Sequence, residues 1–262
     1  MNNMKLQEEF TKESKKKLQN TIIPGLNSTK EDANFVKRVR EINAKSSSLS
    51  GIINIDQIKN PIQFESSLER DYIFLLEYDQ NVKQYLEQPL KIKYIDHNKK
   101  QRTYIPDFIV EHFDNRPTEL IEIKYTSTLK AKKDELEQKF KAARNYCQRN
   151  NLIFKVADEI HIRELRAIEL YNYKFLHRYK NYFHNINKDK TAFPVLNENL
   201  VLLRTKLKEI KKCTVSELVV QSAKDLDKQA ELIFLTWYMV SNNFIKIDLT
   251  KKLTLNSIIC LD

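Results

Sequence analysis

Two short runs in the middle of the chain alternate between apolar and polar residues, as half-buried strands do. A short polar turn that contains Pro117 separates the two runs, which are residues 104–111 and 119–125. Residues two apart on a strand share a face. Glu122 and Lys124 are therefore expected to point to one side, and Ile121 and Ile123 to the other side, into a core.

A helical pattern precedes these strands and places a carboxylate on an apolar face. Its inner stripe is predicted to be Leu68, Tyr72, Ile73, Leu75 and Leu76, after a start near Ser66 or Ser67. Glu69 belongs to that stripe by spacing, and a carboxylate there is costly unless it is paired or bound to a metal. Glu65, one turn earlier, is the rival acid, but we expect it to be exposed near the helix start, where the helix dipole favours acids.

The remaining elements of this region give an α/β pattern. Further strands are predicted over 90–95 and 152–156, and a helix over 129–149 with Leu136, Phe140, Ala143 and Cys147 facing inward. The order is helix, three strands, helix and strand. This is the core order of restriction-endonuclease-like domains, and it places Glu69 on the helix that precedes the sheet.

The character of the chain changes near residue 160, where helical patterns follow one another. Helices are predicted over 163–182, 200–210 and 225–240, with a shorter one that begins at Thr214 or Ser216 as its cap. A strand, turn and strand over 244–255 is typical of a wing. We therefore predict a polar, basic N-terminal arm (1–50), an α/β domain with the restriction-endonuclease-like order (51–159) and a mainly helical, winged-helix-like domain (160–262).

Composition narrows the class of protein. The chain has 262 residues, of which 41% are hydrophobic, and a formal net charge of +10, which favours polyanionic partners such as nucleic acid. Its three cysteines are far apart and form no CxxC pair, which argues against a zinc site or a disulfide framework. The sequence shows neither a secretory signal nor an apolar run of about 18 residues. A cytoplasmic protein without membrane contact is expected.

Candidate chemistry lies on the predicted strands. A neighbouring strand can bring Asp107 beside Glu122 and Lys124, so that two carboxylates and one ammonium meet on one face of a sheet. Magnesium prefers carboxylate and carbonyl oxygens as ligands. A metal held there can activate water and stabilise charge on a phosphate. The residues resemble the PD-(D/E)xK nuclease motif; a hairpin with charges on its wet face is the alternative.

A longer set of residues resembles the TnsA family, the endonuclease subunits of heteromeric cut-and-paste DNA transposases. A Glu at the head of a helix, an apolar run that ends in Glu-Tyr-Asp, and a Gln-Pro before the first strand are features of that family. The segments that carry the resemblance are Phe64–Asp79, Val82, Gln88-Pro89, Ile105–Phe108 and Ile121–Lys124. The later part of the chain is compatible with the smaller helical C-terminal domain of the family.

The resemblance implies an active site and its metals. Its catalytic residues would be Glu69, Asp107, Glu122 and Lys124. Glu69, Asp107, Glu122 and the carbonyl of Ile123 would bind two Mg²⁺ ions, which Mn²⁺ can replace. Asp107 would bridge the ions, and Lys124 would orient the attacking water or neutralise the scissile phosphate.

The resemblance also implies partners. A TnsA-like subunit cuts double-stranded DNA at the 5′ ends of a transposon, a TnsB-like transposase cuts and joins the 3′ ends, and a TnsC-like AAA+ ATPase licenses both. A stand-alone restriction or repair endonuclease of the same fold is an alternative. A non-catalytic winged-helix adaptor that binds DNA is another, although an intact Glu, Asp, Glu and Lys set argues against it.

Exposed lysines are the candidate DNA contacts. Lys130, Lys132 and Lys133 belong to a helix that is more basic than acidic, for which a solvated helix face is the alternative. Lys246, Lys251 and Lys252 belong to the predicted wing, which suits protein docking as well as it suits DNA backbone. His177 and His184 are interpreted as packing residues rather than as a metal pair.

Overall fold

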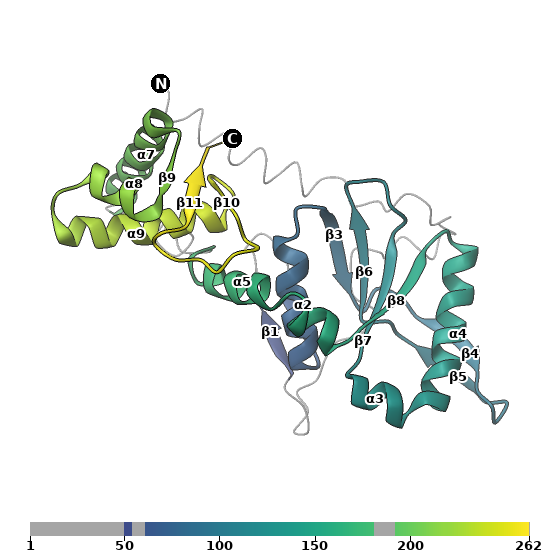
Figure 1. The fold of residues 1–262 in the computed structure, drawn as a ribbon. Coiled ribbons are helices and arrows are strands. Elements are labelled where there is room, and N and C mark those ends of the chain that lie inside the picture. Colours follow the sequence, from purple (N-terminus) through teal and green to yellow (C-terminus); the bar gives the residue numbers. More distant parts are fainter. Residues whose placement is uncertain (1–49, 54–60, 181–191, 262) are drawn as a thin grey trace. The chain divides into compact units, whose positions relative to one another are not determined.

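The computed structural model describes residues 50–53, 61–180 and 192–261, and gives only the backbone for 192–197. His184 and the predicted N-terminal arm up to residue 49 lie outside the described residues. Figure 1 shows the helices and strands with their labels. Contacts group the described chain into two compact units. The first comprises residues 81–122 and 129–156, and the second comprises 50–53, 61–80, 123–128, 157–180 and 192–261. Among the described helices, none is long and apolar enough to cross a bilayer.

Six strands and two helices form between residues 82 and 157. In chain order they are β3 (Val82–Glu87), β4 (Ile92–Ile95), β5 (Gln101–Tyr104), β6 (Phe108–His112), β7 (Glu119–Ile123), α3 (Thr126–Ala131), α4 (Lys133–Arg149) and β8 (Ile153–Ala157). The main sheet has the order β3-β6-β7-β8, while β4 and β5 pair separately as a hairpin. The β3–β6 and β6–β7 pairs are antiparallel. The chain returns through α4 to place β8 beside β7.

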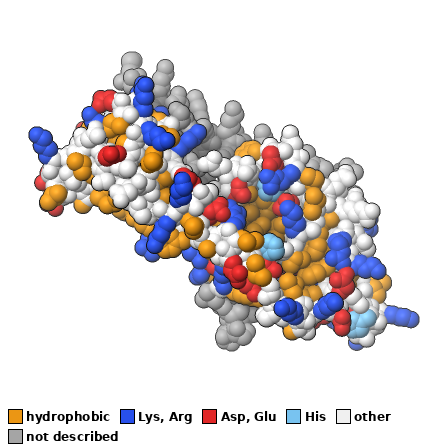
Figure 2. Space-filling view, in the orientation of Figure 1, with side chains coloured by type: hydrophobic (Ala, Val, Ile, Leu, Met, Phe, Trp, Pro, Cys, Tyr) orange, Lys and Arg blue, Asp and Glu red, His pale blue; other side chains and the backbone are white. Residues whose placement is uncertain are grey.

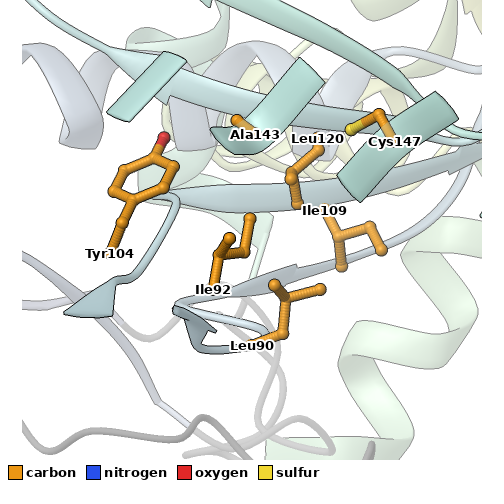
Figure 3. Packing of buried hydrophobic residues seen from close by; sticks show 7 residues of the cluster. All are labelled: Leu90, Ile92, Tyr104, Ile109, Leu120, Ala143 and Cys147. Carbon is orange, nitrogen blue, oxygen red and sulfur yellow. The ribbon is translucent and has the colours of Figure 1, made fainter. Parts of the chain in front are cut away.

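One face of this sheet is covered by α4 and the β4–β5 hairpin. Ile109 and Leu120 are directly opposite each other on β6 and β7, and both are buried. Figure 3 shows them pointing toward residues of the hairpin and of α4. The complete cluster is Leu90, Ile92, Tyr104, Ile109, Leu120, Ala143 and Cys147. Interdigitation of apolar side chains from three elements fixes the position of the strands and of the residues at their ends.

The structure corrects the predicted strands. The strand that begins the main sheet is β3, whereas the predicted strand over 90–95 pairs only with β5 in the separate hairpin. The predicted continuous strand over 104–111 is divided between β5 and β6. The predicted helix over 129–149 is also divided, into α3 and α4, but its predicted inward set of Leu136, Phe140, Ala143 and Cys147 is confirmed by burial.

The second unit contains the helix before the sheet and the C-terminal elements. In chain order its elements are β1 (Gly51–Ile53), β2 (Ile62–Phe64), α2 (Ser67–Tyr78), η1 (Ile160–Glu164), α5 (Ala167–Lys180), α7 (Ala192–Ile210), β9 (Lys212–Thr214), α8 (Val215–Ser222), α9 (Leu226–Ser241), β10 (Lys246–Ile247) and β11 (Ile258–Cys260). The predicted inner stripe of α2 is buried at Leu68, Ile73, Leu75 and Leu76, while Tyr72 is half-buried.

The C-terminal elements form three helices and a small sheet with the order β10-β11-β9. Thr214 caps α8 in a capping box with Glu217, which confirms one of the two predicted caps. The predicted wing strand near Leu253 is wrong: the Leu253 N–H donates to the buried Asn172 of α5, and β10 pairs instead with β11. The winged-helix interpretation of this region stays a prediction.

Candidate active site

Asp107 and Glu122 lie near each other at one end of the main sheet. The register pairs Phe108 with Ile121, and Asp107 directly precedes β6 while Glu122 follows Ile121 on β7. The Asp107 N–H donates to the Ile121 carbonyl at 3.1 Å. The charges of both carboxylates act on the hydroxyl of Tyr104, on β5 of the hairpin. The two carboxylates therefore lie close to this phenol, at the end of the row of apolar residues.

Glu122 is a buried carboxylate rather than a group on a wet face, because only 4% of the residue is exposed. The hydroxyl of Tyr104, on β5, donates to Glu122 Oε2 at 2.6 Å. Burial, the charge of Glu122 and then the charge of Asp107 raise the pKa of Tyr104, which keeps the phenol protonated as a donor. The alternative of a charged hairpin on a solvated face does not fit this burial.

Tyr104→Phe is expected to lower the free energy of unfolding by about 1.5–3 kcal/mol, because it removes a hydrogen bond to a buried charged group. Chemical denaturation of the purified protein measures the change. Tyr94→Phe on the neighbouring strand β4, where the residue is half-exposed, is the matched control and should have a much smaller effect. Equal effects of the two substitutions would contradict the structural importance of the Tyr104–Glu122 bond.

Gln88 lies directly after β3, next to Asp107, and sequence reasoning did not consider it as a candidate ligand. Its N–H donates to the Asp107 carbonyl at 2.8 Å, and its backbone has a φ of 46° directly after β3. The residue is 6% exposed, and its Oε1 atom is buried without a hydrogen-bond partner among the described residues. Two carboxylates and an unmatched buried amide oxygen at the same end of the sheet are oxygen donors of the kind that a hydrated divalent cation takes. The residue types present therefore fit magnesium, which stays a prediction.

Ile123 ends β7, and Lys124 directly follows it. The Lys124 N–H donates to the Ala157 carbonyl at 3.1 Å, which holds the segment after β7 next to the end of β8. The half-buried side chain turns back, and its Nζ donates to the carbonyl of Ile123 at 2.9 Å. The ammonium of Lys124 thus contacts the Ile123 carbonyl, the oxygen that the family resemblance assigns to a metal ion.

Glu69 lies in the first turn of α2 and is 8% exposed, as its position in the apolar stripe predicts. Its two carboxylate oxygens accept from the Glu65 N–H and from the Ser66 hydroxyl, both at 2.8 Å. Ser66 in turn caps the helix by accepting from the Glu69 N–H. Glu69 therefore has a capping role in this structure. Glu65 is half-buried and precedes the helix, rather than being exposed as expected.

The second unit also holds a buried acid that the sequence did not single out. Asp71, on α2, is 2% exposed and is paired with Arg163 at 2.7 Å and with Lys174 at 2.6 Å. The two cations come from η1 and α5, far along the chain. Neither the spacing nor the local charge of Asp71 distinguishes it from an ordinary surface acid of a helix, which is why sequence reasoning missed it.

The six candidate DNA-binding lysines are all exposed. They are Lys130, Lys132, Lys133, Lys246, Lys251 and Lys252. Lys251 is paired with Asp248, and Lys252 lies over the ring of Tyr171 at 5.2 Å. On the face seen in Figure 2, lysine and arginine side chains are dispersed among acidic and apolar ones. Of the two histidines, the described one, His177, packs edge-on against Phe74 as a packing residue would.

Within the described ranges, no three His, Cys, Asp or Glu side chains form a ready-made metal site. Asp107 and Glu122 belong to the first unit, and Glu69 belongs to the second.

Comparison with known proteins identifies one family. Residues 79–159 match the family model described as TnsA-like endonuclease N terminal. The matched segment contains Asp107, Glu122 and Lys124, while Glu69 precedes it. No curated protein matches the chain. The match covers less than half of the chain, and it supports a TnsA-like nuclease with mixed α/β structure.

Proposed function

We propose that the protein is a Mg²⁺-dependent DNA endonuclease that cuts the 5′ ends of a transposon together with an integrase-type transposase. The observation that carries the proposal is that Asp107 and Glu122 both lie near the hydroxyl of Tyr104 at one end of the main sheet, within a segment similar to TnsA-like endonucleases. The buried, unmatched Oε1 of Gln88 at the same end of the sheet supports a cation there.

Each residue has a chemical role in this proposal. Asp107, Glu122 and the Ile123 carbonyl hold divalent ions through oxygen atoms, and Glu69 completes the ligand set that the family resemblance implies. Bound Mg²⁺ supplies a Lewis acid that lowers the pKa of water and offsets phosphate charge. Lys124 donates from Nζ, which orients the attacking water or neutralises the scissile phosphate. Hydrolysis leaves a 5′-phosphate and a 3′-hydroxyl.

The partners follow from the same resemblance. A TnsB-like transposase places the nuclease on the transposon end, and a TnsC-like ATPase licenses cutting. The region after residue 160 docks the ATPase, DNA or both, because every proposed metal ligand precedes it. Salt separates the two roles. DNA binding weakens steeply as salt rises, because each released counterion then gains less entropy, whereas protein docking need not weaken.

Cleavage by the purified protein alone tests the need for a partner. We expect little or no sequence-specific cutting of transposon-end DNA with Mg²⁺, and specific cutting once the partner transposase is added. A substrate with scrambled ends is the control, and it should stay intact in both mixtures. Sequence-specific cutting by the protein alone would instead favour a stand-alone restriction or repair endonuclease of the same fold.

A further inference from the structure

Arg163 is the centre of a hydrogen-bonded network within the second unit. It lies in η1, a short π-helix whose Leu165 N–H donates to the Ile160 carbonyl. Its guanidinium donates from Nε to Asp71 at 2.7 Å and from Nη2 to the Ser67 hydroxyl at 2.9 Å. Single π-helical turns are rare and occur often at functional sites.

The third contact of the guanidinium reaches the segment after the motif strand. Arg163 Nη1 lies 3.4 Å from the hydroxyl of Tyr125, and the guanidinium carbon lies 5.7 Å from the centre of the tyrosine ring. The Tyr125 hydroxyl also shares a hydrogen bond of 2.9 Å with the Ser67 hydroxyl. One side chain of η1 therefore ties the start of α2 to the segment 123–128.

The two anchored positions adjoin candidate catalytic residues. Ser67 precedes Glu69 by two residues on the first turn of α2, and Tyr125 directly follows Lys124. Because both segments belong to one compact unit, the network fixes them relative to each other. We propose that Arg163 is a positioning residue that sets the placement of Lys124 relative to Glu69. For its effect on cleavage, this inference rests on the proposed nuclease function.

Arginine suits this role better than lysine does. A planar guanidinium presents five N–H donors in a fixed fork, so it can bind Asp71, Ser67 and Tyr125 at the same time. A lysine in its place can neutralise Asp71, but its ammonium cannot also span the other two contacts. Lys174 illustrates this limit. Its ammonium pairs with Asp71 at 2.6 Å, and no described hydrogen bond joins it to Ser67 or Tyr125.

The experiment therefore compares Arg163→Lys with Lys174→Met in the full-length protein. Arg163→Lys keeps a cation beside Asp71 and breaks the bridge, whereas Lys174→Met removes a cation from Asp71 and keeps the bridge. Hydrogen exchange measured by mass spectrometry reports on the backbone of residues 123–126. The amides of Lys124 and Thr126 are hydrogen-bonded there, to the Ala157 carbonyl and to Glu159.

We expect Arg163→Lys to speed exchange in residues 123–126 and to lower kcat about tenfold or more with little change in KM, as a misplaced catalytic group does. Lys174→Met should lower the midpoint of thermal unfolding more than Arg163→Lys does, and should leave kcat within about twofold. Unchanged exchange in Arg163→Lys, or an equal loss of kcat in both variants, would overturn the inference.

The cleavage assay tests the proposed nuclease function separately from the role of Arg163. With the partner transposase present, wild-type protein that does not cut transposon-end DNA, or Asp107→Ala protein that cuts it normally, rejects the proposed function. The exchange measurement still decides whether Arg163 fixes the segment around Lys124, because it requires neither DNA nor metal.

Discussion

Asp107→Ala is expected to abolish cleavage of transposon-end DNA and to weaken Mn²⁺ binding by more than about a hundredfold. Loss of outer-shell partners alone costs metal sites about 10–100-fold, so loss of a proposed bridging ligand should cost more. Electron paramagnetic resonance titration of Mn²⁺ measures the affinity, and strand cleavage with Mg²⁺ measures the activity. The fold should survive, because Asp107 is half-buried and is not part of the apolar cluster that joins the sheet to α4 and the hairpin.

Asp114→Ala is the matched control, since Asp114 lies in the exposed turn between β6 and β7 and pairs with Arg116. It should cut and bind Mn²⁺ as the wild type does. An Asp107→Ala protein that cuts at the wild-type rate with Mg²⁺ would show that the active site lies elsewhere.

Lys124→Ala is expected to lower the rate of cleavage by about 10²–10³-fold, as the removal of one preorganised donor at a developing charge does in other enzymes. Mn²⁺ affinity should stay close to that of the wild type, because the ammonium is not a metal ligand. The two substitutions thus separate metal binding from charge stabilisation: Asp107→Ala loses both properties, and Lys124→Ala loses only one.

Lys93→Ala, at an exposed position of β4, controls for the loss of one positive charge. It should leave both measurements unchanged. If Lys124→Ala instead lost Mn²⁺ binding to the same extent as Asp107→Ala, its contact with the Ile123 carbonyl would be a structural support of the metal site, and the role in charge stabilisation would be wrong.

Local patterns predicted the elements well where one face of an element is buried. The inward residues of α4 follow the helical period and were correctly identified, as was the buried stripe of α2 apart from the half-buried Tyr72. In each case the side-chain period alone determines which residues share a face.

Other features depend on partners that the sequence does not reveal. β3 was missed because a register shift between Val82 and Gln84 breaks its alternation. The strand at 90–95 was recognised, but alternation does not say which strand it pairs with. Leu253 was assigned to a strand, while its N–H is taken by Asn172 from a distant helix. The Arg163 network is invisible for the same reason, because its members are far apart in the chain.

The most direct test is to map the DNA termini after reaction of the protein and its partner transposase with transposon-end DNA and Mg²⁺. The account predicts a new 5′-phosphate and 3′-hydroxyl at the 5′ end of the transposon, formed by wild-type protein and absent with Asp107→Ala protein or with a chelator. The same termini formed by Asp107→Ala protein, or formed by wild-type protein in the presence of the chelator, would contradict the account.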